Sequence, residues 1–229
     1  DMDTGEILAG RNEHAAYAPA STIKVLTALT VLDELPLDAT VVANEADTRV
    51  ECNCAGVTPG MTYTARQLLE AMLLVSGNDA ANTLATMLGG REAALMKMNG
   101  KAALLGAYGT NAGSPSGIDG PGIDIWSPPR DLAVIFRAAM ANPVFAQITA
   151  QPSAVFPTRD GDRVLVNQDE LLVRYPGTFG GKTGYTNLAR KTYVGAAQRG
   201  NRRLVVVQMY GSGDLYGQAI ELLDWGFSQ

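Results

Sequence analysis

The most continuous hydrophobic stretch of the chain covers residues 22–32, where apolar side chains occur on nearly every face of a helix with 3.6 residues per turn. A helix with this pattern is expected to be buried on all sides. Pro19, Ala20 and Ser21 precede it and are typical of a helix start. The only charged side chain within the stretch is Lys24.

The middle of the chain carries helical patterns separated by glycine. Thr64 and Gln67 form a capping box, which predicts a helix over residues 65–75. Gly89 and Gly106 are placed where helices end. Further helices are expected over residues 79–88, 92–105 and 127–140, a short one from residue 142, and an amphipathic one over residues 215–227.

Alternating, β-branched segments become frequent after residue 150. Two hairpins are expected, one turning at residues 159–161 and the other at residues 199–201. Residues 1–9 also resemble a strand, which we expect to join the late sheet. The order of strand, helical block and antiparallel sheet predicts an α+β fold in one domain, residues 1–229. Its sheet lobe would comprise about 1–35 and 150–229, and its helical lobe about 36–149.

The composition excludes several classes of protein. The 229 residues carry 18 Lys and Arg against 23 Asp and Glu, and this net charge of -5 argues against a nucleic-acid or polybasic membrane-surface binder. With 46% hydrophobic and 18% charged residues, the chain is neither disordered nor a coiled coil. No apolar run has the length of a membrane span.

Histidine and cysteine chemistry is scarce. The single histidine, His14, lies in a polar stretch and is expected on the surface, so hydrolytic chemistry must proceed without histidine. Cys52 and Cys54 are too few for a zinc ribbon and lack C-x-x-C spacing. They either pair with each other across a small ring or remain separate thiols.

Three short motifs stand in order along the chain: Ser21-x-x-Lys24, Ser76-Gly77-Asn78 and Lys182-Thr183-Gly184. On a helix, residues i and i+3 share a face, so the Lys24 amine can reach the Ser21 hydroxyl. Burial lowers the pKa of a lysine toward that of a usable base, which activates a serine without histidine.

The other two motifs are placed to line a cleft. Ser76 and Asn78 fall between two predicted helices, and Lys182 precedes a predicted sheet with glycines on both sides. The structural alternatives are that Lys24 snorkels to the surface, that Ser21 caps its helix, and that Asn78 caps the helix after it.

The sequence excludes two other kinds of active site. A P-loop ending at Gly181-Lys182-Thr183 requires its first glycine at position 176, which is Pro176. A Ser-His-Asp hydrolase requires a G-x-S-x-G nucleophile elbow, and the chain has none.

The three motifs with their neighbours resemble those of the penicillin-recognising serine enzymes, most closely the D-alanyl-D-alanine carboxypeptidases or low-molecular-mass penicillin-binding proteins. The resemblance covers essentially the whole chain. It also includes Asp3-x-Gly5, Met98-Asn99, and Asn167 with Leu171-Leu172. It implies a β-lactamase/transpeptidase-like fold, in which N- and C-terminal helices flank the antiparallel sheet beside an all-helical lobe.

Class A β-lactamases are the competing members of this superfamily. They need a glutamate between the second and third motifs to activate the deacylating water. No glutamate occurs from Ala93 through Asp169, which favours the carboxypeptidase. A non-catalytic wall-binding homologue is the remaining alternative.

The resemblance also implies roles for particular residues. Ser21 would be the nucleophile and Lys24 its base, while Ser76, Asn78 and Lys182 line the cleft and relay the proton. The backbone N–H groups of Ser21 and Tyr185 would form the oxyanion hole. The substrate-binding residues would be Thr183, Gly184, Tyr185, Thr186 and Arg190.

The family's late carboxylate-binding arginine is absent from residues 211–213, so Arg190 or Arg174 is expected to take that part. No cofactor or metal is implied. The partners implied are a peptidoglycan pentapeptide and β-lactams as covalent inhibitors, with no nucleic acid and no obligate protein partner. An exported protein of the bacterial cell envelope is expected, from which an N-terminal region has been removed.

Overall fold

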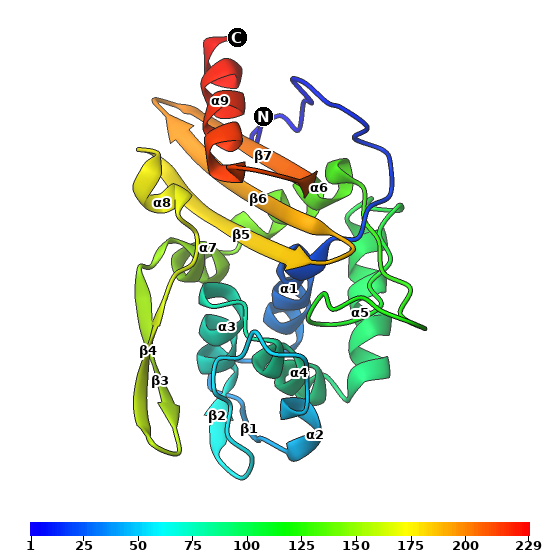
Figure 1. Cartoon of the computed structure of the whole chain (residues 1–229), viewed down its shortest axis with the longest axis vertical. Coiled ribbons are helices and arrows are strands. Elements are labelled where there is room, and N and C mark those ends of the chain that lie inside the picture. The colour runs from blue at the N-terminus through cyan, green and yellow to red at the C-terminus, as the bar shows by residue number, and fades with distance from the viewer.

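The computed structural model describes all 229 residues and has a sheet lobe stacked on a helical lobe (Figure 1). The helices in chain order are the 3-10 turn η1 (Ala20–Ile23), α1 (Lys24–Glu34), α2 (Glu45–Thr48), α3 (Ala65–Leu74), α4 (Asn78–Met87), α5 (Arg91–Leu104), α6 (Pro129–Met140), α7 (Pro143–Ala150), α8 (Leu171–Arg174) and α9 (Leu215–Ser228).

The strands form three antiparallel sheets. The largest has the order β5-β6-β7, and the other two are the pairs β1-β2 and β3-β4. The strands are β1 (Thr40–Val42), β2 (Thr62–Thr64), β3 (Ser153–Thr158), β4 (Gly161–Val166), β5 (Thr178–Thr186), β6 (Arg190–Arg199) and β7 (Arg202–Gly211). Both hairpins expected from the sequence are therefore confirmed, and so is the α+β class.

The three-stranded sheet is covered on both faces. Tyr193 and Ala197 of β6 pack with α9, whereas Val194 and Ala196 pack in the main core with the helices below (Figure 1). Because successive side chains of a strand point to opposite faces, one strand supplies both cores. The central strand β6 is accordingly buried from Thr192 to Ala197.

Helix α1 crosses the molecule beneath this sheet and is buried from Lys24 to Val31, as its hydrophobic pattern predicts. The helical lobe around it also follows the sequence. The capping box of Thr64 and Gln67 is present at the start of α3, and the predicted ends of α3, α4 and α5 agree with the structure to within one residue.

The strand predicted over residues 1–9 is wrong. Asp1 folds this segment into a turn, because its side chain accepts hydrogen bonds from the backbone N–H groups of Asp3 and Thr4, and its carbonyl accepts one from Gly5. Gly5 has a φ of +80°, which is outside the strand region. A single backbone hydrogen bond, from Met2 to Arg203, links the segment to β7.

The structure also decides two predictions about the cysteines and the histidine. Cys52 and Cys54 form a disulfide with each other, and their Cα atoms are 4.9 Å apart. His14 is on the surface, with 74% of its side chain exposed.

No single helix is long and apolar enough to cross a membrane. Helices α6 and α7 have the length and apolar composition of a membrane span only when they are taken together, and they are bent by 101° at their junction.

Candidate active site

The first motif lies at the entrance to α1, directly beneath the edge strand β5. Ser21 belongs to the 3-10 turn η1, and Lys24 is the first residue of α1. The turn places Lys24 Nζ 2.7 Å from Ser21 Oγ. Ala20 has a φ of +48°, a left-handed conformation that is uncommon outside glycine and is typical of functional sites.

Lys24 is held in a closed polar cage. Its side chain is 0% exposed, and Nζ donates to Asn78 Oδ1 at 2.7 Å and to the carbonyl of Ser116 at 2.6 Å. Burial is the largest cause that holds the Lys24 pKa well below its usual value. The neighbouring Lys182 lowers this pKa further, and Asp79 opposes both effects.

This cage can hold a neutral amine. Nζ donates to Ser21 Oγ, Asn78 Oδ1 and the Ser116 carbonyl. A neutral lysine has two N–H bonds and one lone pair; when Lys24 is neutral, the two oxygens that can only accept keep its hydrogens, and its lone pair faces the Ser21 hydroxyl. The arrangement can therefore remove a proton from Ser21.

The second motif connects α3 to α4 through an unusual backbone. Ser76 has a φ of +61° and is 3% exposed, and Asn78 is the first residue of α4. Asn78 makes no side-chain cap, because its amide is used between Lys24 and the carbonyl of Glu51. The helix-capping alternative for Asn78 is therefore wrong.

Asp79, the second residue of α4, anchors the loop at residues 55–57. Its carboxylate accepts hydrogen bonds from the backbone N–H groups of Ala55, Gly56 and Val57, each at 2.9 Å. Asp79 is 2% exposed, so its negative charge stays within the interior that also holds Lys24.

The third motif lies on β5, whose outer edge is not paired with another strand. Lys182 is 2% exposed, and its Nζ donates to Ser76 Oγ at 3.0 Å and to the Thr183 carbonyl at 2.7 Å. Burial lowers the Lys182 pKa to about 7, against the opposing effect of Asp169.

The alternative in which Lys24 snorkels to the surface is wrong, because the Lys24 side chain does not reach the surface.

Asp169 lies behind the third motif, on the opposite face of β5. It is 3% exposed and accepts hydrogen bonds from the Leu171 N–H at 3.1 Å and from the Tyr193 hydroxyl at 3.1 Å. A Cβ at Gly181 would collide with both Asp169 and Tyr193, so glycine is required there. Burial raises the pKa of Asp169 to about 6.

Backbone N–H groups lie beside the nucleophile. A Cβ at Gly184 would be 2.7 Å from Ser21 N, so β5 lies directly against the amide of Ser21. The Thr183 carbonyl faces the Lys182 amine at the open edge of β5. In an antiparallel strand, the N–H and C=O of one residue point to the same edge, and those of the next residue point to the other edge. Tyr185 comes two residues after Thr183, so its N–H faces this same open edge.

The remaining predicted substrate residues lie at the end of β5. Tyr185 is 60% exposed, and Thr186 donates a hydrogen bond to Asp119. Arg190 is the register partner of Thr186, is exposed, and has a φ of +58°. Arg174 lies elsewhere, with its guanidinium bound to Asp214 at 2.7 Å and 3.0 Å.

Three residues of the loop between α5 and α6 were missed by sequence reasoning. Ser116 supplies the carbonyl bound by Lys24, and Asp119 accepts from Thr186. Gly117 has a φ of +87°, and a Cβ there would collide with the Ala20 carbonyl. A glycine within Ser-Pro-Ser-Gly was the one available signal that this loop approaches another backbone.

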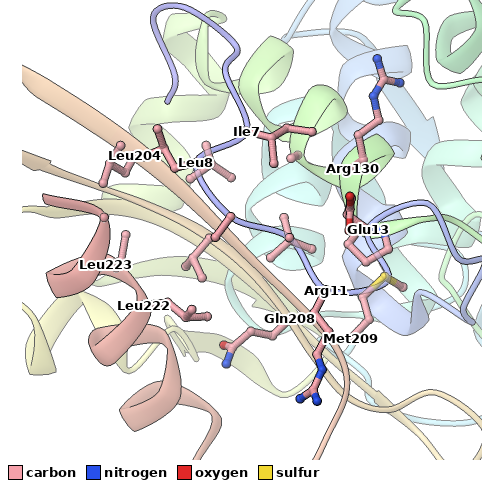
Figure 2. Close-up of a pocket in the computed structure, with 18 of the residues that line it drawn as sticks. Ile7, Leu8, Arg11, Glu13, Arg130, Leu204, Gln208, Met209, Leu222 and Leu223 are labelled. Atoms are coloured by element: carbon pink, nitrogen blue, oxygen red, sulfur yellow. The ribbon is translucent and has the colours of Figure 1, made fainter. Parts of the chain in front are cut away.

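A cavity of about 870 Å³ lies apart from the three motifs. It lies between the N-terminal segment, β7, α6 and α9, and includes no residue of the three motifs. Figure 2 shows Leu8 and Leu204 lining it at one end and Glu13 and Arg130 at the other. The candidate active site is instead the junction of η1, the α3–α4 turn and the edge of β5.

Comparison with known proteins agrees with this geometry. A family model described as D-alanyl-D-alanine carboxypeptidase, peptidase family S11, matches residues 1–213. The chain belongs to this family. It is accordingly an enzyme of the serine-type D-alanyl-D-alanine carboxypeptidase class, as its three motifs predict.

The chain is 65% identical to the D-alanyl-D-alanine carboxypeptidase DacB2 of Mycobacterium tuberculosis H37Rv, over 100% of this chain and 80% of the relative. It is 29% identical to the carboxypeptidase DacF of Bacillus subtilis, over 100% of this chain and 61% of that longer relative.

Solved structures give the same result. A D-alanyl-D-alanine carboxypeptidase from M. tuberculosis H37Rv superimposes with a TM-score of 0.98 at 64% identity, covering 100% of this chain and 89% of the other. The Streptomyces K15 DD-transpeptidase superimposes with a TM-score of 0.92 at 30% identity, covering 100% and 94%. The β-lactamase/transpeptidase-like fold expected from the sequence is confirmed.

Proposed function

We propose that the protein removes the terminal D-alanine from peptidoglycan stem peptides ending in D-Ala-D-Ala, through an ester formed on Ser21. The observation that carries this proposal is the 2.7 Å separation of Lys24 Nζ and Ser21 Oγ inside a cage that suits a neutral amine. A base so placed activates a serine hydroxyl without histidine.

In the first step, Ser21 Oγ attacks the carbonyl carbon of the penultimate D-alanine, and its proton passes to Lys24 Nζ. The carbonyl oxygen becomes negative and is stabilised by the backbone N–H groups of Ser21 and Tyr185. The C–N bond then breaks, and the departing D-alanine amine takes the proton that Lys24 accepted, relayed through Ser76 Oγ, so that Lys24 is neutral again for the second step. The contact between Ser76 Oγ and Lys182 Nζ at 3.0 Å supports this relay by holding the Ser76 hydroxyl.

In the second step, water hydrolyses the ester. Lys24 accepts a proton from the water as its oxygen attacks the ester carbon. The C–O bond to Ser21 breaks, and the serine oxygen regains a proton from Lys24. Asn78 holds Lys24 in place through both steps, which its 2.7 Å contact with Nζ supports. Each group returns to its starting state.

The substrate would bind as an extra strand along the open edge of β5, beside Thr183, Gly184, Tyr185 and Thr186. Its terminal carboxylate would lie near Arg190 at the exposed end of the strand. The absence of a side chain at Gly184 lets β5 lie directly against the Ser21 amide, which supports a peptide on this strand being close to the nucleophile.

A β-lactam would acylate Ser21 in the same way, but its leaving amine remains tethered to the ester and obstructs water. The absence of a glutamate from residue 93 to residue 169 supports slow deacylation. Glu170 is exposed and pairs with Arg174. The protein would thus be a target of these antibiotics rather than a resistance enzyme.

An exported location in the bacterial cell envelope fits this substrate. The Cys52–Cys54 disulfide supports it, because disulfides persist in oxidising compartments. The reaction as written requires only peptide and water, with no further protein partner.

The test is a stoichiometric pulse of penicillin followed by time-resolved intact mass and peptide mapping, with D-alanine release from a D-Ala-D-Ala peptide assayed in parallel. The expected result is an adduct on the Ser21 peptide that persists for minutes, together with D-alanine release. Both should be lost in Ser21→Ala. Hydrolysis of many penicillin molecules per second would identify a β-lactamase instead. If the protein forms no adduct and releases no D-alanine, it is a non-catalytic wall-binding homologue.

A further inference from the structure

The Cys52–Cys54 disulfide lies on the loop that contacts Asn78. The Asn78 backbone N–H donates to the Asn53 carbonyl at 2.7 Å, and the Asn78 side-chain Nδ2 donates to the Glu51 carbonyl at 2.8 Å. The two accepting carbonyls thus flank Cys52 on either side, one within the disulfide ring and the other immediately before it.

The Glu51 carbonyl determines which way the Asn78 amide points, while the Asn53 carbonyl holds the Asn78 backbone. The amide has an NH₂ end that donates and an oxygen end that accepts. Since a carbonyl can only accept, Glu51 binds the NH₂ end and thereby leaves Oδ1 facing Lys24 at 2.7 Å. If the Glu51 carbonyl moved away, the amide could rotate and present NH₂ to Lys24, and the cage would lose one of its two acceptors.

Little besides the disulfide fixes the backbone at this point. Glu51, Cys52 and Asn53 are exposed and belong to no helix or strand. The anchoring hydrogen bonds to Asp79 begin only at Ala55. Arg163 donates to the Cys54 carbonyl at 3.3 Å from the exposed surface. The covalent ring across Asn53 is therefore the strongest restraint on the two carbonyls.

We propose that the Cys52–Cys54 disulfide is a positioning element of the active site, acting through Asn78 on Lys24, and that its reduction slows acylation of Ser21. A dithiol reductant supplies two electrons and two protons, and the S–S bond becomes two thiols while the reductant becomes its own disulfide. The inference rests on the proposed acyl-enzyme, and it makes the reaction sensitive to thiols at a site that forms no bond to substrate.

The experiment compares the oxidised protein with protein reduced by dithiothreitol, with the redox state of each verified by thiol alkylation and mass. The acylation rate with penicillin is measured along with kcat and KM for a D-Ala-D-Ala peptide. A displaced catalytic group costs up to about 10²-fold in rate, so reduction is expected to lower acylation and kcat by about 10-fold or more. KM should change little, because no hydrogen bond joins residues 51–54 to β5, the proposed substrate strand. Reoxidation should restore the rate.

The matched control is the double variant Cys52→Ser with Cys54→Ser, which should have the low rate of the reduced protein and no response to dithiothreitol. If that variant fails to fold, reduction of the folded wild type still gives the answer. Equal rates in the two redox states, with Ser21 acylated in both, overturn this inference and leave the proposed function intact. An increase in KM with kcat unchanged also overturns it. No adduct in either state overturns both.

Discussion

Two buried lysines meet at the active site, and the structure treats them differently. Lys24 begins a helix and lies within 2.7 Å of three oxygen atoms, while Lys182 lies within a strand and contacts two oxygens, at 3.0 Å and 2.7 Å. Both are at most 2% exposed. Burial alone therefore does not distinguish them, and the difference between their roles must come from their neighbours.

The charges around the two lysines differ. Burial lowers the pKa of Lys182 to about 7, opposed by Asp169, and it holds the pKa of Lys24 well below its usual value, reinforced by Lys182 and opposed by Asp79. Part of the difference is mutual, because the positive charge of Lys182 itself disfavours a second charge on Lys24. The comparison teaches that the cation on β5 helps to keep the helix lysine neutral and therefore basic.

The largest effect is expected from removing the base. Lys24→Ala should lower the acylation rate by about 10²-fold to 10⁴-fold, the usual contribution of a general base. Thr30→Val is a suitable control, since Thr30 is also buried on α1 but bonds only to the Leu26 carbonyl. The measurement is the penicillin acylation rate, with circular dichroism for folding. Acylation by Lys24→Ala at the wild-type rate would remove Lys24 from the base role.

Replacing the second lysine should have a smaller effect of a different kind. Lys182→Met should lower acylation by about 10²-fold through loss of the proton relay. It should also move the acidic limb of the pH profile to higher pH, because without the Lys182 charge the pKa of Lys24 rises and the neutral base forms later. An acidic limb that stays in place would show that the two lysines do not interact.

Neither lysine is free to bind the substrate carboxylate, so an exposed cation is required. Arg190→Ala should lower kcat/KM for the peptide by about 10-fold to 10²-fold, the value of a charge-assisted hydrogen bond of about 1.5 to 3 kcal/mol. Arg174→Ala is the matched control, since Arg174 is bound to Asp214 and should leave kcat/KM unchanged. Equal values for Arg190→Ala and the wild type would exclude Arg190 from carboxylate binding.

The sequence predicted this site better than it predicted some of the fold around it. The three motifs could be found because each combines side chains whose chemistry is recognisable, and α3 could be found because its capping box is local. The strand expected over residues 1–9 failed because hydrogen bonds to Asp1 outweighed an extended pattern. Periodicity describes which faces are apolar, and it does not register a competing turn of this kind.

The contributions of Ser116 and Asp169 could not be predicted for a different reason. Ser116 acts through its backbone carbonyl, which every residue possesses, so no residue type marks the position. Asp169 acts from the far face of β5, and only the folded sheet brings it behind Lys182. Contacts that depend on backbone atoms or on the reverse face of a strand leave no pattern in the sequence.

The smallest expected effect concerns the carboxylate of Asp169. The negative charge of Asp169 favours the protonated form of Lys182, although burial keeps the Lys182 pKa near 7. Asp169→Asn removes the charge and keeps the size of the side chain. Lys182 should then lose its proton at lower pH, so that the alkaline limb of the acylation profile moves down by about one pH unit, a free-energy change of about 1.4 kcal/mol. The acidic limb, which reports Lys24, should move less.

A second readout separates this electrostatic role from simple packing. Asp169 has its pKa raised from 3.8 to about 6 on folding, so its contribution to stability is fully present below pH 3.8 and is lost as the pH rises through 6. Asp169→Asn should therefore weaken the pH dependence of the unfolding free energy between about pH 4 and pH 6, as measured by urea titration. Asp162→Asn removes the same charge from an exposed position on β4 and should change neither profile. If Asp169→Asn lowered stability equally at every pH and left the alkaline limb unmoved, Asp169 would serve packing alone, and the difference between the two lysines would have to arise from the charges of Lys182 and Asp79 acting on Lys24.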